Sequence, residues 1–500
     1  MKKRLLKIVS IVCCLSLCLT VTCCSVYKQV EKASKNLTKY NITMALNEQD
    51  MSFDVVQEVN VVNQTKVLLN NLCFNLYAKA FSEQANIKPY TSVNKDKCFP
   101  NGIDYGDITI KNVYIEDNLT GYEFVGVDKN ALKINLNQEL EPKEQVDVKI
   151  EYNLKLANCV HRLGYYNGSI NLGNFYPVLA VYEKGDFVIE PYYSSGDPFY
   201  TNIANYNVTI IYPEQYSLSS SGYVTNKKQE KGQICQSLKA LAVRDFAITL
   251  TKDAVTESAK VDNTIVKYTG YKGDSNIKQC LKTCQKAVEF YNKTFGEYPY
   301  KTLEIVKTPF LHGGMEYAGM VTISDSFTEQ FDIDRVIAHE IAHQWWYGVV
   351  GNNQIKEAWL DETLTEYSSM LFLESYKEYE VSYEELISQA FANYTLYVDI
   401  IKTIEGKIKT SMLLHINEYS SEYEYSYMIY VRGTLMFDDI REIIGKEKLI
   451  KALKNYYKKY KFKIATTDDL IAVFINSSRR DIGGVFDSWL SGKTAVISIN

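Results

Sequence analysis

Histidine and proline are scarce in this 500-residue chain, and positively charged residues are fewer than negatively charged ones. Its 55 Lys and Arg are outnumbered by 60 Asp and Glu, which leaves a formal net charge of −5. The sequence shows no basic stripe, so nucleic acid is not expected as a partner. With only 9 Pro and 46% hydrophobic residues, the composition is that of a globular protein and not of a disordered tail. A chain of this length predicts two or three domains.

Cysteine is common only at the N-terminus. Five of the 11 Cys lie within residues 1–24. Six sparse cysteines over the rest of the chain do not make a disulfide framework. Cys280 and Cys284 are spaced i, i+4 on an expected helix, but no partner pair is evident, so we interpret them as core residues or free thiols.

The first 24 residues have the pattern of a targeting segment. Lys2, Lys3, Arg4 and Lys7 precede an uncharged, mostly apolar run over residues 8–24. A basic start followed by an apolar run is typical of a secretory signal peptide. The run is also nearly long enough to remain as a membrane anchor, and its last two cysteines suggest a lipoprotein as a third interpretation. We therefore expect an extracytoplasmic protein, either secreted or anchored to the cell membrane.

The remaining chain changes character once. Residues 25–45 are polar and lysine-rich and are interpreted as a linker. Residues 46–257 contain short alternating segments separated by turn residues, which predicts a β-sandwich-like domain. After a boundary near 255–262, helical patterns dominate, among them 276–295, 332–350, 356–378 and 423–444. This part is assigned to a second domain over residues 258–491, followed by a tail at 492–500.

The strongest chemical signal is the run His339-Glu340-Ile341-Ala342-His343. On a helix, residues at i and i+4 share one face, so both imidazoles can bind one zinc ion. Glu340 lies beside the first histidine and can act as a general base on water. The third ligand is predicted to come from the helix that follows. Spacing alone leaves two candidates for it, Glu362 and Glu366.

At this point the residues resemble those of a known family, the aminopeptidase N-like zinc metallopeptidases, which are gluzincins. The family's zinc signature is H-E-x-x-H followed after 18 residues by Glu, and it selects Glu362 over Glu366. The segment 359–362 resembles W-L-N-E with Asp361 in place of Asn. The segment 313–317 resembles G-x-M-E-N with Tyr317 in place of Asn, and 430–433 resembles Y-x-K-G with Arg432 in place of Lys.

The resemblance implies a thermolysin-like, mainly α catalytic domain behind the N-terminal β domain, with one zinc ion per chain. It implies that His339, His343 and Glu362 bind the metal. Larger members of the family carry further C-terminal domains, among them a helical cap over the active site, which we do not expect in this chain. The other implied roles are Glu340 as the general base, Tyr430 as a donor to the oxyanion, and Gly313, Gly314, Met315 and Glu316 as substrate-binding residues.

These roles predict an aminopeptidase that acts on peptides. Glu316 would pair with the free α-ammonium of the substrate and so select the N-terminal bond. An oligopeptidase or endopeptidase with an open cleft is the alternative within enzymes, since Tyr317 changes the anchor motif. A third interpretation is a catalytically idle relative that binds peptides or serves as a membrane-associated subunit. His312 precedes the anchor loop and could line the site, although we favour an ordinary loop histidine.

Overall fold

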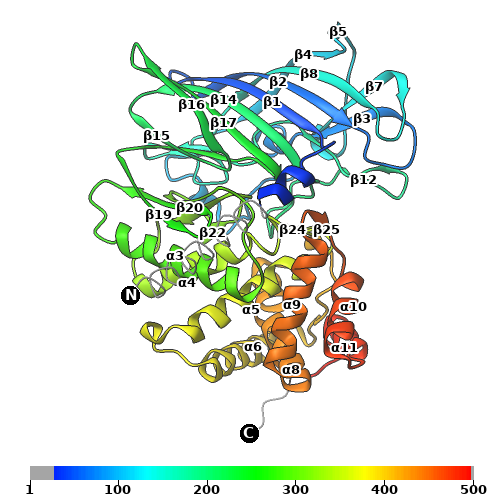
Figure 1. Cartoon of the computed structure of the whole chain (residues 1–500), viewed down its shortest axis with the longest axis vertical. Coiled ribbons are helices and arrows are strands. Elements are labelled where there is room, and N and C mark those ends of the chain that lie inside the picture. Colours follow the sequence, from blue (N-terminus) through cyan, green and yellow to red (C-terminus); the bar gives the residue numbers. More distant parts are fainter. Residues whose placement is uncertain (1–26, 497–500) are drawn as a thin grey trace, which may run out of the picture.

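The computed structural model describes residues 27–496 and shows a β-rich part stacked on a mainly helical part (Figure 1). This arrangement confirms the predicted fold class. The leader assigned to residues 1–24 lies outside the described residues. Among the helices of residues 27–496, none combines the length and apolar character needed to cross a membrane.

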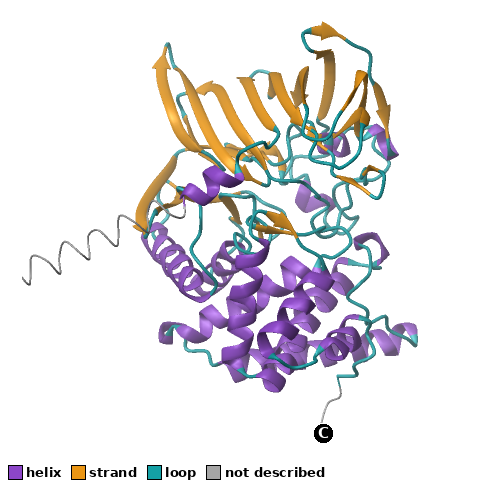
Figure 2. Ribbon diagram, turned by 45° about the vertical axis from the view of Figure 1, so that its right-hand side comes forward, coloured by secondary structure: helices purple, strands orange, loops and turns teal. Residues whose placement is uncertain are grey.

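The β-rich part is built on one large curved sheet of eight strands (Figure 2). The outward side chains of its strands alternate with buried ones; in β2, for example, Phe53, Val55, Val59 and Val61 are buried. The strand order is β16 (Tyr223–Glu230), β17 (Gln233–Val243), β14 (Ala204–Pro213), β1 (Lys39–Asn47), β2 (Ser52–Val62), β8 (Gln145–Lys155), β4 (Asp107–Ile115) and β5 (Asn118–Leu119).

Two four-stranded sheets and a short hairpin of β12 (Tyr182–Glu183) with β13 (Asp186–Phe187) complete this part. Gln57 on the large sheet donates to the carbonyl of Pro177 at 2.9 Å, and Tyr40 accepts from the amide of Leu179 at 3.0 Å. These contacts join the large sheet to the smaller layer. The smaller sheets are β15 (Tyr216–Ser220), β18 (Ile248–Lys252), β10 (Ser169–Leu172), β9 (Leu163–Tyr166), and β11 (Val178–Leu179), β3 (Leu69–Asn75), β7 (Ala131–Leu140), β6 (Glu123–Val125).

Two domain boundaries differ from those expected. The linker over residues 25–45 ends inside β1, a central strand that pairs in parallel with β14 and antiparallel with β2. Its Tyr40, Ile42 and Met44 are buried, so this polar-looking stretch carries one apolar face. The boundary at 257/258 cuts through β19 (Ala254–Val261), which forms a hairpin with β20 (Thr264–Tyr271) and so belongs to the second part.

The second part begins with a five-stranded sheet ordered β19, β20, β21 (Thr302–Thr308), β23 (Met320–Ser324) and β22 (Gly314–Met315). Strands β20, β21 and β23 run parallel, and β22 is an antiparallel edge. Helices α3 (Ile277–Thr294) and α4 (Gln330–Ala342) pack on each other and against this sheet. Cys280 and Cys284 are buried free thiols on the inner face of α3.

Helices form the remainder of this part (Figure 1). A short parallel bridge of β24 (Val350–Gly351) with β25 (Lys463–Ile464) links the segment after α4 to the one before α10. The helices are α5 (Trp359–Ser375), α6 (Tyr383–Glu405), α7 (Glu422–Ser426), a π-helix labelled η5 (Tyr427–Arg432), α8 (Gly433–Ile444), α9 (Lys446–Tyr460), α10 (Thr467–Ser478) and α11 (Gly483–Leu490). The single helix expected over 423–444 is therefore interrupted by a wider π segment.

Candidate metal centre

The two histidines of the H-E-x-x-H run project from the last turn of α4. The opposite face of this helix is anchored by buried apolar residues, among them Ile337 and Ile341. His339 lies within the helix, and His343 is its C-cap with helical backbone angles. Their rings are 5.0 Å apart, as the i, i+4 spacing predicts.

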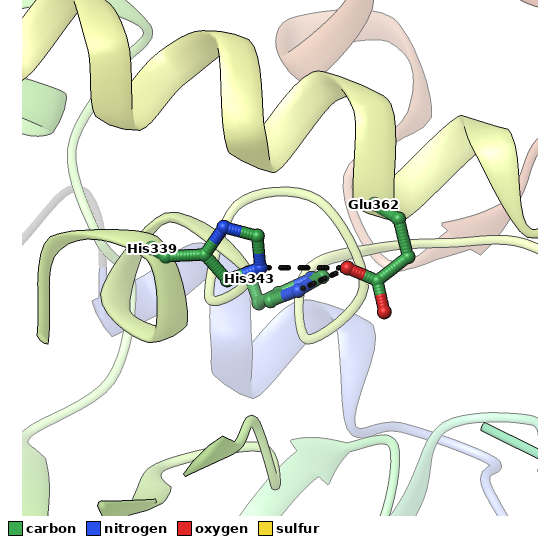
Figure 3. A group of neighbouring side chains, drawn as sticks. All are labelled: His339, His343 and Glu362. Carbon is green, nitrogen blue, oxygen red and sulfur yellow. Dashed lines mark hydrogen bonds and ion pairs between the residues drawn. The ribbon is translucent and has the colours of Figure 1, made fainter. Parts of the chain in front are cut away.

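Glu362 completes the group from the first turn of α5 (Figure 3). Its Oε2 atom lies 3.1 Å from Nε2 of His343 and 3.4 Å from Nε2 of His339. One ligand atom from each residue lies within 4.8 Å of the others. Burial would lower the pKa of His339, but hydrogen bonds to Glu362 and Glu366 outweigh it and raise this pKa to about 9. His339 and His343 in turn lower the pKa of Glu362.

The outer nitrogen of each ring is also held. Nδ1 of His339 lies 2.9 Å from Oε2 of Glu366. Nδ1 of His343 lies 3.2 Å from the carbonyl of Trp346 and 3.1 Å from the hydroxyl of Thr365. Such contacts fix the orientation of a metal-binding imidazole and leave Nε2 to face the metal. Two imidazoles and one carboxylate converge with oriented rings, and this donor set fits zinc with a coordination position left open.

Glu340 lies beside this group under the edge strand β22. It is 7% exposed, and its Oε2 atom has no hydrogen-bond partner among the described residues. A Cβ atom built on Gly314 would lie 2.5 Å from the Glu340 carboxyl, so a larger residue there would displace the Glu340 side chain. Gly313 has open space by comparison, with its nearest neighbour, the ring of Phe327, 3.6 Å away. Burial raises the pKa of Glu340 to about 8.

Glu316 follows β22 and is 3% exposed. Gln354 donates through Nε2 to Glu316 at 2.9 Å and to Asp361 at 2.7 Å. The aspartate that replaces asparagine in the W-L-N-E-like segment therefore shares one amide with the predicted substrate anchor. Burial, together with the nearby charge of Asp197, raises the pKa of Glu316 to about 8.

Tyr430 reaches the site from the π-helix η5. Its ring stacks on the ring of His339, with centroids 5.8 Å apart and planes 29° apart. A π turn inserts one additional residue into a helix and changes the direction in which the following side chains point, and such turns are common at functional sites. The sequence pattern predicted a regular helix here, because a π turn leaves no distinct signal in the apolar spacing.

The β-rich part supplies two site residues that the sequence-based list omitted. Arg162 and Asp197 both line the cavity above the metal centre, which has a volume of about 380 Å³. Arg162 Nη2 lies 2.5 Å from Asp197 Oδ1, and its Nε donates to the sulfur of Met315 at 3.2 Å. Both residues are nearly buried, so this pair holds Met315 in place from the other domain. Asp197 lies in a turn between Gly196 and Pro198, and a turn pattern does not by itself predict a binding or catalytic role.

Two further expectations are changed by the structure. His312 is not an ordinary loop residue, because it lines the cavity and its Nε2 atom is buried without a hydrogen-bond partner among residues 27–496. Tyr317 turns away from the metal centre toward the β-rich part, where a Cβ atom on Gly173 would collide with its hydroxyl. Tyr317, which replaces the Asn of the G-x-M-E-N pattern, thus packs at the contact between the two parts.

Comparisons with known proteins agree with this geometry. Residues 280–489 match the model of the Peptidase family M1 domain. The chain is 23% identical over 283 residues to Probable aminopeptidase 1 of Saccharolobus solfataricus, and this match covers 54% of the chain and 34% of that protein. The chain thus matches about a third of the length of this relative.

Solved structures show a similar fold over nearly the whole chain. An M1 zinc metallopeptidase from Deinococcus radiodurans has a TM-score of 0.67 at 15% identity, covering 92% of this chain and 94% of that chain. A mutant of that metallopeptidase, bound to a Tyr-Ser-Ala substrate, also has a TM-score of 0.67, at 14% identity. At this level of identity the likeness establishes the fold.

Proposed function

Because this chain belongs to the M1 peptidase family through its domain at residues 280–489, we propose that it is a zinc-dependent aminopeptidase that removes N-terminal residues from peptides. The observation that carries the proposal is the buried carboxylate of Glu316 beside the metal centre. A free α-ammonium can pair with it, whereas a blocked N-terminus brings no positive charge to this carboxylate. The Deinococcus relative was solved with a short peptide substrate, which supports peptides as the substrate class.

One zinc ion per chain would be held by His339, His343 and Glu362. When bound, it supplies a Lewis acid that polarises the scissile carbonyl and acidifies a water molecule. The chain's own residues perform the remaining steps. Glu340 takes a proton from the attacking water and later gives it to the leaving amine. One of its carboxylate oxygens is buried without a hydrogen-bond partner among the described residues, so that oxygen is free for the proton.

Tyr430 supports the same reaction from the other side of the metal centre. Its hydroxyl donates a hydrogen bond to the oxyanion that develops as water attacks the carbonyl. Stacking on His339 and the fixed π-helical backbone hold the ring in place before substrate binds. Glu316 holds the α-ammonium, so the bond presented to Glu340 is the first one in the peptide.

The test compares a peptide with a free N-terminus and its N-acetylated twin. We expect the zinc-loaded protein to release amino acids from the free peptide only. Glu340→Gln should keep zinc and lower kcat by about 10²–10⁴-fold. Glu316→Gln should weaken the preference for the free N-terminus. Cleavage of both peptides would indicate an open-cleft endopeptidase, and no cleavage by zinc-loaded protein would favour a peptide-binding protein without activity.

We also propose an extracytoplasmic location, supported by the basic and then apolar sequence of residues 1–24. Fractionation of cells expressing the full chain, with and without these residues, tests it. Recovery of the full chain in the cytoplasm would contradict this part of the proposal.

A further inference from the structure

Arg335 lies on α4 two turns before His343 and lines the cavity. Its side chain is 54% exposed, unlike the buried groups around the metal centre. Glu316 lies beside His343, since the two residues have ligand atoms within 4.8 Å of each other. The predicted anchor for the α-ammonium therefore lies beside His343, whereas the guanidinium of Arg335 contacts Glu366, the partner of His339.

The guanidinium of Arg335 has unused hydrogen-bond donors. Its Nη2 atom lies 3.1 Å from Oε1 of Glu366, and no other hydrogen bond of this side chain is found within residues 27–496. Oε2 of Glu366 is already taken by His339. An arginine has five N–H donors arranged to bind a carboxylate through two parallel bonds. Most of these donors remain available to a ligand in the cavity.

The other groups in the cavity do not compete for this role. Arg162 is the second arginine of the cavity lining, and it is buried and occupied by Asp197 and Met315. Among the nearby acidic groups, Glu422 accepts from Asn94 through both oxygens, at 3.1 and 2.9 Å. Asp332 is exposed and forms no ion pair among the described residues. Arg335 is thus the one cation of the described lining that can meet a substrate anion.

The guanidinium of Arg335 lies one carboxylate away from the metal centre. Its Nη2 atom is 3.1 Å from Oε1 of Glu366, and Oε2 of Glu366 is 2.9 Å from Nδ1 of His339. A short peptide whose first bond lies at the metal ligands can therefore reach Arg335 with its C-terminal carboxylate.

We propose that Arg335 binds the C-terminal carboxylate of short peptide substrates. This inference rests on the proposed aminopeptidase function, because it places the substrate's α-ammonium at Glu316. The peptide then runs along α4 with its first peptide bond beside the metal ligands and its carboxylate at Arg335. Arg335 acts as a specificity-determining residue, and it takes no part in proton transfer.

Binding to zinc-loaded Glu340→Gln protein provides a test that does not depend on turnover. A tripeptide and its C-terminal amide, both with free N-termini, are titrated by calorimetry. We expect the free acid to bind roughly tenfold to a hundredfold more tightly than the amide, as a charge-assisted contact predicts. Adding Arg335→Gln should bring the ratio of the two dissociation constants close to one. Adding Lys448→Gln, which removes an exposed charge on α9, should leave the ratio as it was.

Turnover by the otherwise unaltered protein provides the second readout. We expect kcat/KM to be higher for a tripeptide with a free C-terminus than for its C-terminal amide, with the difference mainly in KM. Arg335→Lys should keep part of the preference, since it keeps the charge and loses the paired geometry.

Three results would overturn the inference. They are equal binding of acid and amide, a preference that persists in Arg335→Gln, and a loss of affinity that is the same for both ligands. The third result would mean that Arg335 only supports Glu366 and His339. If zinc-loaded protein cleaves no peptide while the binding ratio follows Arg335, the proposed activity fails and the carboxylate site stands.

Discussion

Glu366 contacts His339 on the ring nitrogen that faces away from the metal centre, with Oε2 2.9 Å from Nδ1. The residue that spacing left as a rival third ligand is therefore the partner that orients the first one. Its second oxygen is held by Arg335 at 3.1 Å, and these contacts hold the pKa of Glu366 down at about 2 in spite of burial.

We expect Glu366→Gln to weaken zinc binding by about 10- to 100-fold, because the ring of His339 loses the carboxylate that fixes its orientation. Competition with a chelator at fixed pH measures this change. Glu289→Gln, which alters an exposed carboxylate on α3, is the matched control and should bind zinc like the unaltered protein. Complete loss of zinc in Glu366→Gln would mean that Glu366 is a direct ligand.

Gly314→Ala should inactivate the protein without unfolding it. The added Cβ atom would lie 2.5 Å from the carboxyl of Glu340 and force that side chain out of its pocket. We expect kcat to fall by at least as much as a lost general base predicts, about 10²-fold, with zinc content unchanged. Gly313→Ala is the control, because its Cβ meets nothing closer than 3.6 Å. Equal activity of the two variants would contradict this account.

Arg244 joins the two parts of the molecule. It donates to the carbonyls of Tyr347 at 2.9 Å, Thr201 at 2.8 Å and Lys463 at 3.2 Å. Arg244→Met would leave these carbonyls without their charged donor, and we expect the free energy of unfolding to fall by roughly 3–5 kcal/mol. Urea unfolding followed by fluorescence measures the change. Lys448→Met, at an exposed position on α9, should unfold within about 0.5 kcal/mol of the unaltered protein.

The buried carboxyl of Asp245 is expected to make the free energy of unfolding depend on pH. Burial raises its pKa from 3.8 to about 6, although Tyr347 and the amide of Ala318 donate hydrogen bonds to it. The folded protein therefore holds this proton more tightly than the unfolded chain. The stabilisation is complete below about pH 3.8 and is lost as the pH rises through about 6, a change of about 3 kcal/mol.

Asp245→Asn removes this titration and keeps one acceptor oxygen, so it retains one of the two hydrogen bonds, which Ala318 and Tyr347 donate to different oxygens of Asp245. We expect the variant to gain stability relative to the unaltered protein as the pH rises from 4 to 7. Urea unfolding at each unit of pH measures the difference. Curves that stay parallel over this range would show that Asp245 keeps an ordinary pKa in the folded protein.

The sequence by itself determined the part of the site that lies on regular helices. The spacing of His339 and His343 places both rings on one face, since a helix has 3.6 residues per turn. The resemblance to a known family selected Glu362, and the structure brings its carboxylate to both Nε2 atoms. The alternation of apolar residues likewise predicted a β-rich part followed by a helical part.

Only the tertiary structure decided how residues distant in sequence meet. Arg162 and Asp197 reach the cavity because the β-rich part packs over the metal centre, and no local pattern encodes that packing. The π turn that presents Tyr430 has the same apolar spacing as a regular helix. The free donors of Arg335 depend on which neighbours occupy Glu366 and Glu422. Periodicity reports which face of an element is buried, whereas the partner of that face is set by long-range packing.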